Sequence, residues 1–218
     1  MVATLDPALA AKIDALDAGL RQLGNTVIAF SGGADSAFLA ATARRVLGAE
    51  RAHCVTAVSP SLAGDEERDC RALAQEWDLR WTPVITHEME RAAYRLNDTN
   101  RCFHCKAELM DVVGPIAKAE GATIVLGVNI DDLGDHRPGQ QAAEQAGAVF
   151  PLVDAGFTKS DVRAASAYLG LRTHDKPAAA CLASRIPYGT EVSVGILSRV
   201  DRAEAALRRL GFAQVRVR

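Results

Sequence analysis

The chain lacks the sequence features of a membrane or secreted protein. No apolar run approaches the roughly 20 residues that a membrane-spanning helix needs. The N-terminal segment carries Asp6, Asp14 and Asp17 instead of a basic stretch followed by an apolar one. Its five cysteines are an odd number, which argues against a framework of disulfide bonds. We therefore expect a cytoplasmic protein with no membrane association.

A strong charge of either sign is also missing. The 25 Lys and Arg residues nearly balance the 27 Asp and Glu residues, which leaves a formal charge of −2. Such a balance provides no basic field for binding nucleic acid. The length of 218 residues suffices for one sizeable core. We expect a globular protein that acts on a small molecule.

Two common phosphate-binding motifs are absent as well. No G-x-x-x-x-G-K-[ST] occurs, which argues against a Walker-type NTPase. No G-x-G-x-x-G follows a predicted strand, so the dinucleotide-binding fingerprint is missing. The chain instead has Ser31-Gly32-Gly33-Ala34-Asp35-Ser36, between the apolar run 26–30 and the helix-like stretch 37–47.

This Ser-Gly-Gly segment has the properties of an anion-binding turn. Gly32 and Gly33 allow positive φ angles and a close approach, so that consecutive N–H groups can converge on a phosphate. The dipole of the following helix and the hydroxyls of Ser31 and Ser36 favour the same negative charge. The carboxylate of Asp35 fits if Mg²⁺ accompanies the phosphates. The alternative is a strand-to-helix turn that merely requires glycine.

Apolar strands alternate with helices along the chain, which predicts an α/β fold with a parallel sheet covered on both faces. The predicted strands are 26–30, 53–58, 81–86 and 123–128, and a last one is expected at 212–218. The predicted helices are 7–23, 37–47, 64–77, 106–119, 159–169 and 194–210. We place a domain boundary near Gly156, between a nucleotide-binding domain 1–156 and a small C-terminal α/β region 157–218.

Two polar loops follow, in the places where such sheets bind ligands. The first, 129–139, contains Asn129, Asp131 and Asp132, which suit the rim of a nucleotide or metal site. A solvated turn explains the same residues equally well, because Asn, Asp and Gly are common in turns.

The second loop, 175–189, contains Cys181 between Lys176 and Arg185. Nearby cations lower the pKa of a thiol and raise its thiolate fraction, as a nucleophile requires. A buried structural cysteine is the alternative. The flanking charges and the hydroxyl of Ser184 favour a reactive thiol.

The motif S-G-G-x-D-S resembles the PP-loop of the adenine nucleotide α-hydrolase superfamily, whose members cleave ATP between the α- and β-phosphates. Four more strings make the resemblance specific. They are N-R-C-x-x-C-K at 100–106, G-x-N-x-D-D-x-x-D-x-R-P-G at 127–139, D-K-P-A-x-A-C-L-A-S-R-I-P-Y-G at 175–189 and L-G-F-x-Q-V-R-V-R at 210–218. Together they resemble the ATP-dependent sacrificial sulfur transferases of the LarE family over nearly the whole chain.

The resemblance implies a Rossmann-like PP-loop fold and an enzyme that uses ATP and Mg²⁺. Its substrate would be pyridinium-3,5-biscarboxylic acid mononucleotide, on the route to the nickel-pincer cofactor of lactate racemase. The enzyme would adenylate a carboxylate, and a cysteine would transfer its sulfur to give a thiocarboxylate and leave dehydroalanine in the protein. Family members form homo-oligomers, hexamers among them. They also continue beyond the V-R-V-R string, so either this chain is truncated after Arg218 or the sequence omits a disordered tail.

Site residues carry over by matching positions. Ser31, Gly32, Gly33, Asp35 and Ser36 would hold pyrophosphate, with Asp35 at the Mg²⁺, and we add Asn129, Asp131 and Asp132 to the nucleotide site. Arg216, Arg218, Ser184 and Arg185 are assigned to the phosphate of the substrate. Cys181 would donate the sulfur. The base that removes its Cα proton is Lys176 or Glu204, and the sequence does not choose between them.

The sulfur source and the activity each leave alternatives. Some relatives use an iron–sulfur cluster held by three cysteines, but Cys181 has no other cysteine in the C-terminal stretch, which favours the sacrificial version. Cys102 and Cys105 form a single C-x-x-C, for which a redox dithiol or a structural turn is more plausible than a metal site. The competing functions are another PP-loop enzyme, such as an amidotransferase-type synthetase or a tRNA-thiolating enzyme, and a nucleotide-binding regulatory module.

Overall fold

Four parallel strands form the centre of the molecule in the computed structural model, which describes residues 5–133, 138–212 and 214–218. The strands are β1 (Thr26–Ala29), β2 (Ala52–Val58), β3 (Arg80–Ile85) and β4 (Thr123–Leu126), in the spatial order β3-β2-β1-β4. Val27 of β1 is in register with His53 of β2 and Ile124 of β4. The parallel α/β sheet expected from the alternating pattern is confirmed.

Helices connect the strands and continue after them. They are α1 (Pro7–Leu23), α2 (Ala34–Leu47), α3 (Gly64–Glu76), α4 (Ala92–Arg95), α5 (Arg101–Glu120), α6 (Pro138–Gln145), α7 (Pro151–Asp154), α8 (Lys159–Tyr168) and α9 (Val194–Arg209). Short 3-10 turns lie at η1 (Ala49–Arg51), η2 (Glu88–Glu90), η3 (Ile130–Asp132) and η4 (Leu182–Arg185). No helix in the described ranges is long and apolar enough to cross a membrane.

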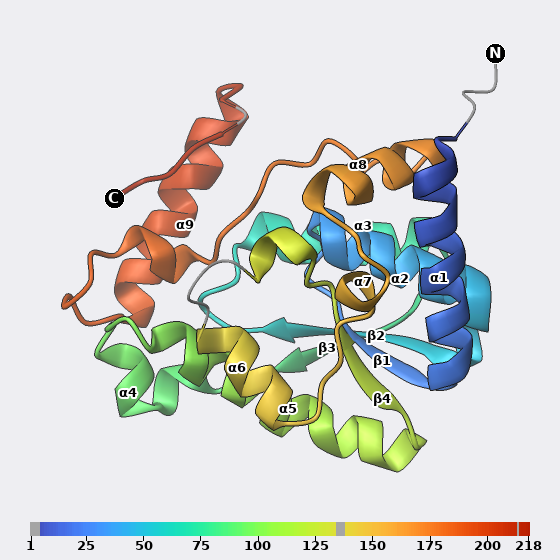
Figure 1. Cartoon of the computed structure of the whole chain (residues 1–218). Helices are drawn as coiled ribbons and strands as arrows, with labels where there is room; N and C mark the ends of the chain where they lie inside the picture. Colours follow the sequence, from blue (N-terminus) through green and yellow to red (C-terminus); the bar gives the residue numbers. More distant parts are fainter. Residues whose placement is uncertain (1–4, 134–137, 213) are drawn as a thin grey trace.

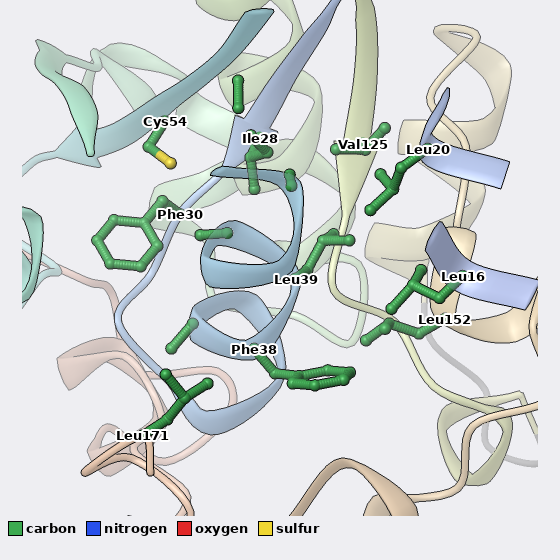
Figure 2. Packing of buried hydrophobic residues seen from close by; sticks show 14 of the residues in the cluster. Leu16, Leu20, Ile28, Phe30, Phe38, Leu39, Cys54, Val125, Leu152 and Leu171 are labelled. Carbon is green, nitrogen blue, oxygen red and sulfur yellow. The ribbon is translucent and has the colours of Figure 1, made fainter. Parts of the chain in front are cut away.

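One face of the sheet carries the main hydrophobic core. Ile28, Cys54 and Val125 point from three strands into this core, where they meet Phe38 and Leu39 of α2 (Figure 2). Helices α1, α3, α7 and α8 complete the same layer. Figure 1 shows α1, α2, α3 and α8 together on this side of the sheet.

The other face packs against α5 and α6. Val27, Val55 and Ile124 alternate with the residues of the first face and meet Val113 of α5 and Ala143 of α6. Because both faces are covered, the two central strands β1 and β2 and the edge strand β4 are mostly apolar, whereas the edge strand β3 also carries Arg80 and Thr82. The molecule is therefore a three-layer arrangement of helices, sheet and helices, and its loops meet at the carboxyl ends of the strands.

The C-terminal region departs from the prediction. The strand expected at 212–218 is wrong, because residues 214–218 form no strand in the structure. Alternation of Val and Arg is compatible with a strand, but a strand also needs a partner to pair with. Instead, the Val217 N–H donates a hydrogen bond to Glu204 Oε1 of α9 at 3.1 Å.

A third, smaller core lies under the C-terminal part of the chain. It joins Leu182 and Ile186 to Leu197 of α9, and it also includes Ala63 and Tyr94 from the first half of the chain. The main core, in contrast, continues past Gly156 to Leu171. The domain boundary near Gly156 thus stays a prediction, and the packing changes from one core to the other after Leu171.

Candidate active site

The Ser-Gly-Gly turn connects β1 to α2 and keeps its shape through its two serines. The Ser31 and Ser36 hydroxyls lie 2.9 Å apart, and Ser36 Oγ donates to the Gly33 carbonyl at 3.1 Å. Gly32 has a φ of +69°, and a Cβ there would come within 2.8 Å of Cys70 Sγ. Gly33 has an ordinary φ of −71° and caps α2. The first N–H groups of α2 therefore face the turn without intrahelical partners, as an anion site requires.

A second glycine lets another strand approach the same turn. A Cβ on Gly127, directly after β4, would lie 2.7 Å from the Ser36 backbone nitrogen. Only a residue without a side chain permits this contact, because the three nearest atoms all belong to the backbone of Asp35 and Ser36. Gly127 thereby brings the loop after β4 against the N-terminus of α2.

Asp35 and the loop after β4 form one polar group. Asp35 is ion-paired with Lys159 of α8, and Asn129 Nδ2 donates to Asp35 Oδ1 at 3.2 Å. Asp131 accepts the Lys159 backbone N–H at 2.8 Å, and Asp132 accepts the Asn129 N–H at 3.2 Å. The predicted nucleotide residues of the two loops are thus brought together.

This group fits Mg²⁺ held mainly by a nucleotide. Mg²⁺ usually binds one or two carboxylates together with substrate phosphates, and Asp35 provides one carboxylate beside the anion-binding turn. Within the described residues, no three His, Cys, Asp or Glu side chains are grouped to hold a metal ion by themselves. When the metal binds, Asp35 would give up its ion pair with Lys159 and bind Mg²⁺ instead.

Cys181 is exposed and lies at the edge of a cavity of about 350 Å³. The same cavity is lined by Ser31 and Ser36 of the anion-binding turn and by apolar residues at the ends of β1, β2 and β4. The predicted thiol and the predicted phosphate site therefore share one cavity.

Arg185 and Glu204 hold the loop of Cys181. Arg185 donates to the carbonyls of Ala180 at 2.6 Å and Cys181 at 3.1 Å, and its Nε and Nη2 bind the Glu204 carboxylate at 2.8 and 3.0 Å. Leu182 N–H donates to the Ser61 carbonyl at 2.9 Å, which ties the loop to the end of β2.

Lys176 and Glu204, the two residues predicted as candidate bases, are both held in ion pairs. Lys176 Nζ binds Asp69 at 2.6 Å, Glu66 at 2.8 Å and the Gly32 carbonyl at 3.1 Å. Burial acts to lower the pKa of Lys176, but its hydrogen bonds and the charges of the two acids raise it overall. Lys176 is therefore a protonated clamp in this arrangement and has no lone pair for a proton.

Glu204 is also an unsuitable base here. It is fully buried, and burial would raise its pKa. Hydrogen bonds from Arg185 and the Val217 N–H, with the charges of Arg185 and Arg208, outweigh that effect and lower the pKa of the carboxyl. A carboxylate stabilised by two guanidinium groups holds its neighbours in position but accepts protons poorly.

The residues assigned to the substrate phosphate separate into two sets. Arg216 is exposed and lines a second cavity, of about 490 Å³, with Lys176, Arg185 and Arg208. Arg218 is exposed two residues further on. Arg185, in contrast, is buried and uses its donors on Glu204, Ser184 Oγ and the two carbonyls. In this structure, Arg185 and Ser184 belong to the support of the Cys181 loop.

Sequence reasoning missed several residues of the first cavity. Glu88, Ser61, Cys105 and Lys106 line it beside Cys181. Cys105, of the C-x-x-C predicted as a redox dithiol or a structural turn, lies outside the loop of Cys181 but lines the same cavity. Burial raises the pKa of Cys105 to about 12, and the charges of Glu88 and Cys181 contribute. For Ser61 the sequence did offer a signal, because Ser59-Pro60-Ser61 directly follows a predicted strand, where ligand-binding loops occur.

Comparison with known proteins agrees with this geometry. Residues 12–108 match the NAD synthase family model. The fold resembles the NH3-dependent NAD synthetase from Campylobacter jejuni with a TM-score of 0.62 and 17% identity, over 95% of this chain and 86% of that one. The fold and the anion-binding turn define an enzyme of the PP-loop class.

Two relatives make the assignment narrower. The chain is 47% identical over 211 residues to the uncharacterized protein slr1717 of Synechocystis, covering 96% of this chain and 78% of that protein. It is 35% identical over 211 residues to the pyridinium-3,5-bisthiocarboxylic acid mononucleotide synthase of Lactiplantibacillus plantarum, covering 96% and 76%. The chain belongs to the family of this synthase, which is the LarE family.

Proposed function

We propose that the protein is an ATP-dependent sulfur transferase that acts on pyridinium-3,5-biscarboxylic acid mononucleotide. The observation that supports this most directly is the shared cavity of Cys181 and the Ser31–Ser36 turn. A thiol at the edge of an ATP-binding cavity can attack a carboxylate that has been activated there. An ATP-dependent synthetase that uses ammonia would have no need for this cysteine.

The reaction has three steps. A substrate carboxylate attacks the α-phosphorus of ATP, which gives an acyl-adenylate and releases pyrophosphate into the Ser-Gly-Gly turn. The Cys181 thiolate attacks the acyl carbon and AMP leaves, which forms a thioester. A base then takes the Cα proton of Cys181, the Cβ–S bond breaks, and the sulfur departs with the substrate as a thiocarboxylate. The protein retains dehydroalanine at position 181.

The cationic cavity suits the phosphate of the mononucleotide. Arg216 and Arg208 line this second cavity together with residues 176–179, and Cys181 of the same loop lines the first cavity. Arginine binds phosphate in a bidentate manner. A substrate anchored there would reach across the loop toward Cys181. Arg218, close in the chain, would add to the same positive field.

ATP and Mg²⁺ are the cofactors of the proposal. Ser31, Ser36 and the N-terminus of α2 would hold the leaving pyrophosphate, and Asp35 would bind the metal, with Asn129, Asp131 and Asp132 supporting it. The metal would neutralise phosphate charge as the α-phosphorus is attacked.

We further propose a homo-oligomer in a reducing cytoplasm. All five cysteines are free thiols, and the exposed side chains of Leu210 and Phe212 offer an apolar contact near the C-terminus. Light scattering of the purified protein checks the oligomer, and a monomer at all concentrations would refute it.

Intact-protein mass spectrometry tests the function. The protein is incubated with ATP, Mg²⁺ and the mononucleotide, and we expect loss of one H₂S equivalent that peptide analysis maps to Cys181. Cys181→Ala should still release pyrophosphate but lose no sulfur, and Cys102→Ala, which removes another exposed thiol, should behave as the wild type. Thiolated product with an unchanged protein mass would show that the sulfur comes from elsewhere and would overturn the proposal.

A further inference from the structure

Glu88 is a buried carboxylate of the Cys181 cavity, and it forms no ion pair among the described residues. Its side chain is 2% exposed. The hydroxyls of Ser59 and Ser61 both donate to Oε1, and the Ser61 bond is 2.7 Å long. Among the described residues, no hydrogen bond or ion pair reaches Oε2, and Glu88 lines the cavity. Burying a carboxylate without a salt bridge is costly, which calls for a functional explanation.

The backbone brings this carboxylate close to Cys181. The Ser61 hydroxyl binds Glu88, while the Ser61 carbonyl accepts the N–H of Leu182, the residue after Cys181, at 2.9 Å. Ser61 therefore bridges the two, through its side chain on one side and its backbone on the other.

Glu88 and Cys181 line one cavity together with Cys105 and Lys106. Tyr94 is 1% exposed and belongs to the small core that contains Leu182, the residue after Cys181. Burial raises the pKa of Tyr94, and the charges of Cys181, Cys105 and Glu88 add to that effect. After burial, the charges of Glu88 and Cys181 also raise the pKa of Cys105.

We propose that Glu88 is the proton acceptor for the Cα proton of Cys181 in the elimination step. The proposal rests on the proposed sulfur transfer. A Glu88 oxygen takes the proton, the electron pair of the Cα–H bond forms the Cα=Cβ bond, and the pair of the Cβ–S bond leaves with the thiocarboxylate. Glu88 ends protonated. Lys176 and Glu204 are both held in ion pairs, whereas Glu88 lines the cavity and its Oε2 has no hydrogen bond or ion pair within the described residues.

The test is Glu88→Gln, followed by intact mass and AMP release. Adenylation and thioester formation need no base at this position, so we expect AMP release to continue and the thioester of protein and substrate to accumulate. Loss of H₂S should slow by roughly 10²- to 10⁴-fold, as expected for removal of a general base. Glu90→Gln is the matched control, since Glu90 lies in the same 3-10 turn with its side chain 78% exposed.

Other outcomes separate this proposal from the proposed function. If Glu88→Gln and the wild type lose H₂S at the same rate, Glu88 is not the acceptor although the sulfur transfer stands. If Lys106→Met accumulates the thioester and Glu88→Gln does not, Lys106 is the acceptor and the proposal is overturned. If wild-type protein releases no AMP, the sulfur transfer itself is wrong. Should Glu88→Gln fail to fold, Glu88→Asp and a deuterium isotope effect with α-deuterated cysteine replace it, and an isotope effect unaltered by Glu88→Asp refutes the assignment.

Discussion

The five thiols of the chain occupy different environments. Cys54 and Cys70 lie in the main core, and Cys105 is a half-buried residue of α5 that lines the first cavity. Burial raises the pKa of Cys54 to about 12, that of Cys70 to about 11 and that of Cys105 to about 12. Cys102 and Cys181 are exposed.

These environments predict the order of alkylation. At pH 8 a thiol with a pKa of 11 is only about 0.1% thiolate, and the thiolate is the reactive form. Iodoacetamide should therefore label Cys102 and Cys181 first, with Cys54, Cys70 and Cys105 slower by roughly 100-fold, as read by peptide mapping. All five should react at similar rates in urea. Equal labelling of Cys105 and Cys181 in the folded protein would contradict this view of the cavity.

Local chemistry explains which site residues could be predicted. The Ser-Gly-Gly turn and Cys181 carry their signals in their immediate neighbours, so the sequence identifies them without the fold. Glu88 and Lys159 give no such signal, because Glu88 meets Ser61 and Lys159 meets Asp35 only through packing. Arg185 was assigned to phosphate because its charge is visible in the sequence, while its burial beside Glu204 is not.

At the scale of elements, α9 supports the Cys181 loop through one buried ion pair. Glu204 of α9 and Arg185 of η4 are 0% and 6% exposed in their side chains. Removing one partner of a buried pair leaves the other charge uncompensated, which typically costs about 3–5 kcal/mol. Glu204→Gln should lower the free energy of unfolding by about that amount at pH 7, measured by urea denaturation.

The same variant has a defined pH dependence. The pKa of Glu204 is lowered in the folded state. Its contribution to the free energy of unfolding is therefore complete above the pKa of the unfolded state, about 4.3, and is lost as the pH falls through the pKa of the folded state. The difference in stability between wild type and Glu204→Gln should therefore shrink below about pH 4. Glu191→Gln is the control, because Glu191 is 72% exposed opposite Arg95 and should cost less than about 1 kcal/mol. A difference that grows at low pH would contradict the assignment.

Elements with their own periodicity were predictable, and those that depend on partners were not. The four strands of the sheet are short segments rich in apolar and β-branched residues, and α1 begins at Pro7 with the Asp6 carboxylate accepting the Ala8 N–H. Residues 212–218 alternate as a strand would, but the described part of the sheet ends at β3 and β4. Alternation of apolar and polar residues is a property of a single segment, whereas a β-strand forms only when a neighbouring strand pairs with it.

At the scale of the molecule, α3 joins the nucleotide turn to the C-terminal region. Lys176 binds Glu66 and Asp69 of α3 and the carbonyl of Gly32, while Arg208 of α9 binds Asp65 at 2.9 Å. Arg172 adds a further ion pair with Asp69 at 2.7 Å. The chain is thus attached to α3 both before the Cys181 loop, through Lys176, and after it, through Arg208.

Lys176→Met tests whether this clamp acts by position or by chemistry. Loss of the ammonium leaves Glu66 and Asp69 facing each other, so amide hydrogen exchange should increase in residues 177–189 while the β1 and β4 amides stay protected. Sulfur transfer should slow by roughly tenfold because the thiol is less well placed. The variant should still lose one H₂S equivalent per protein molecule by the end of the reaction, since Lys176 accepts no proton. Lys118→Met, on an exposed position of α5, is the control. A thioester that accumulates in Lys176→Met, with exchange unchanged, would make Lys176 the base and require Glu88 to have another role.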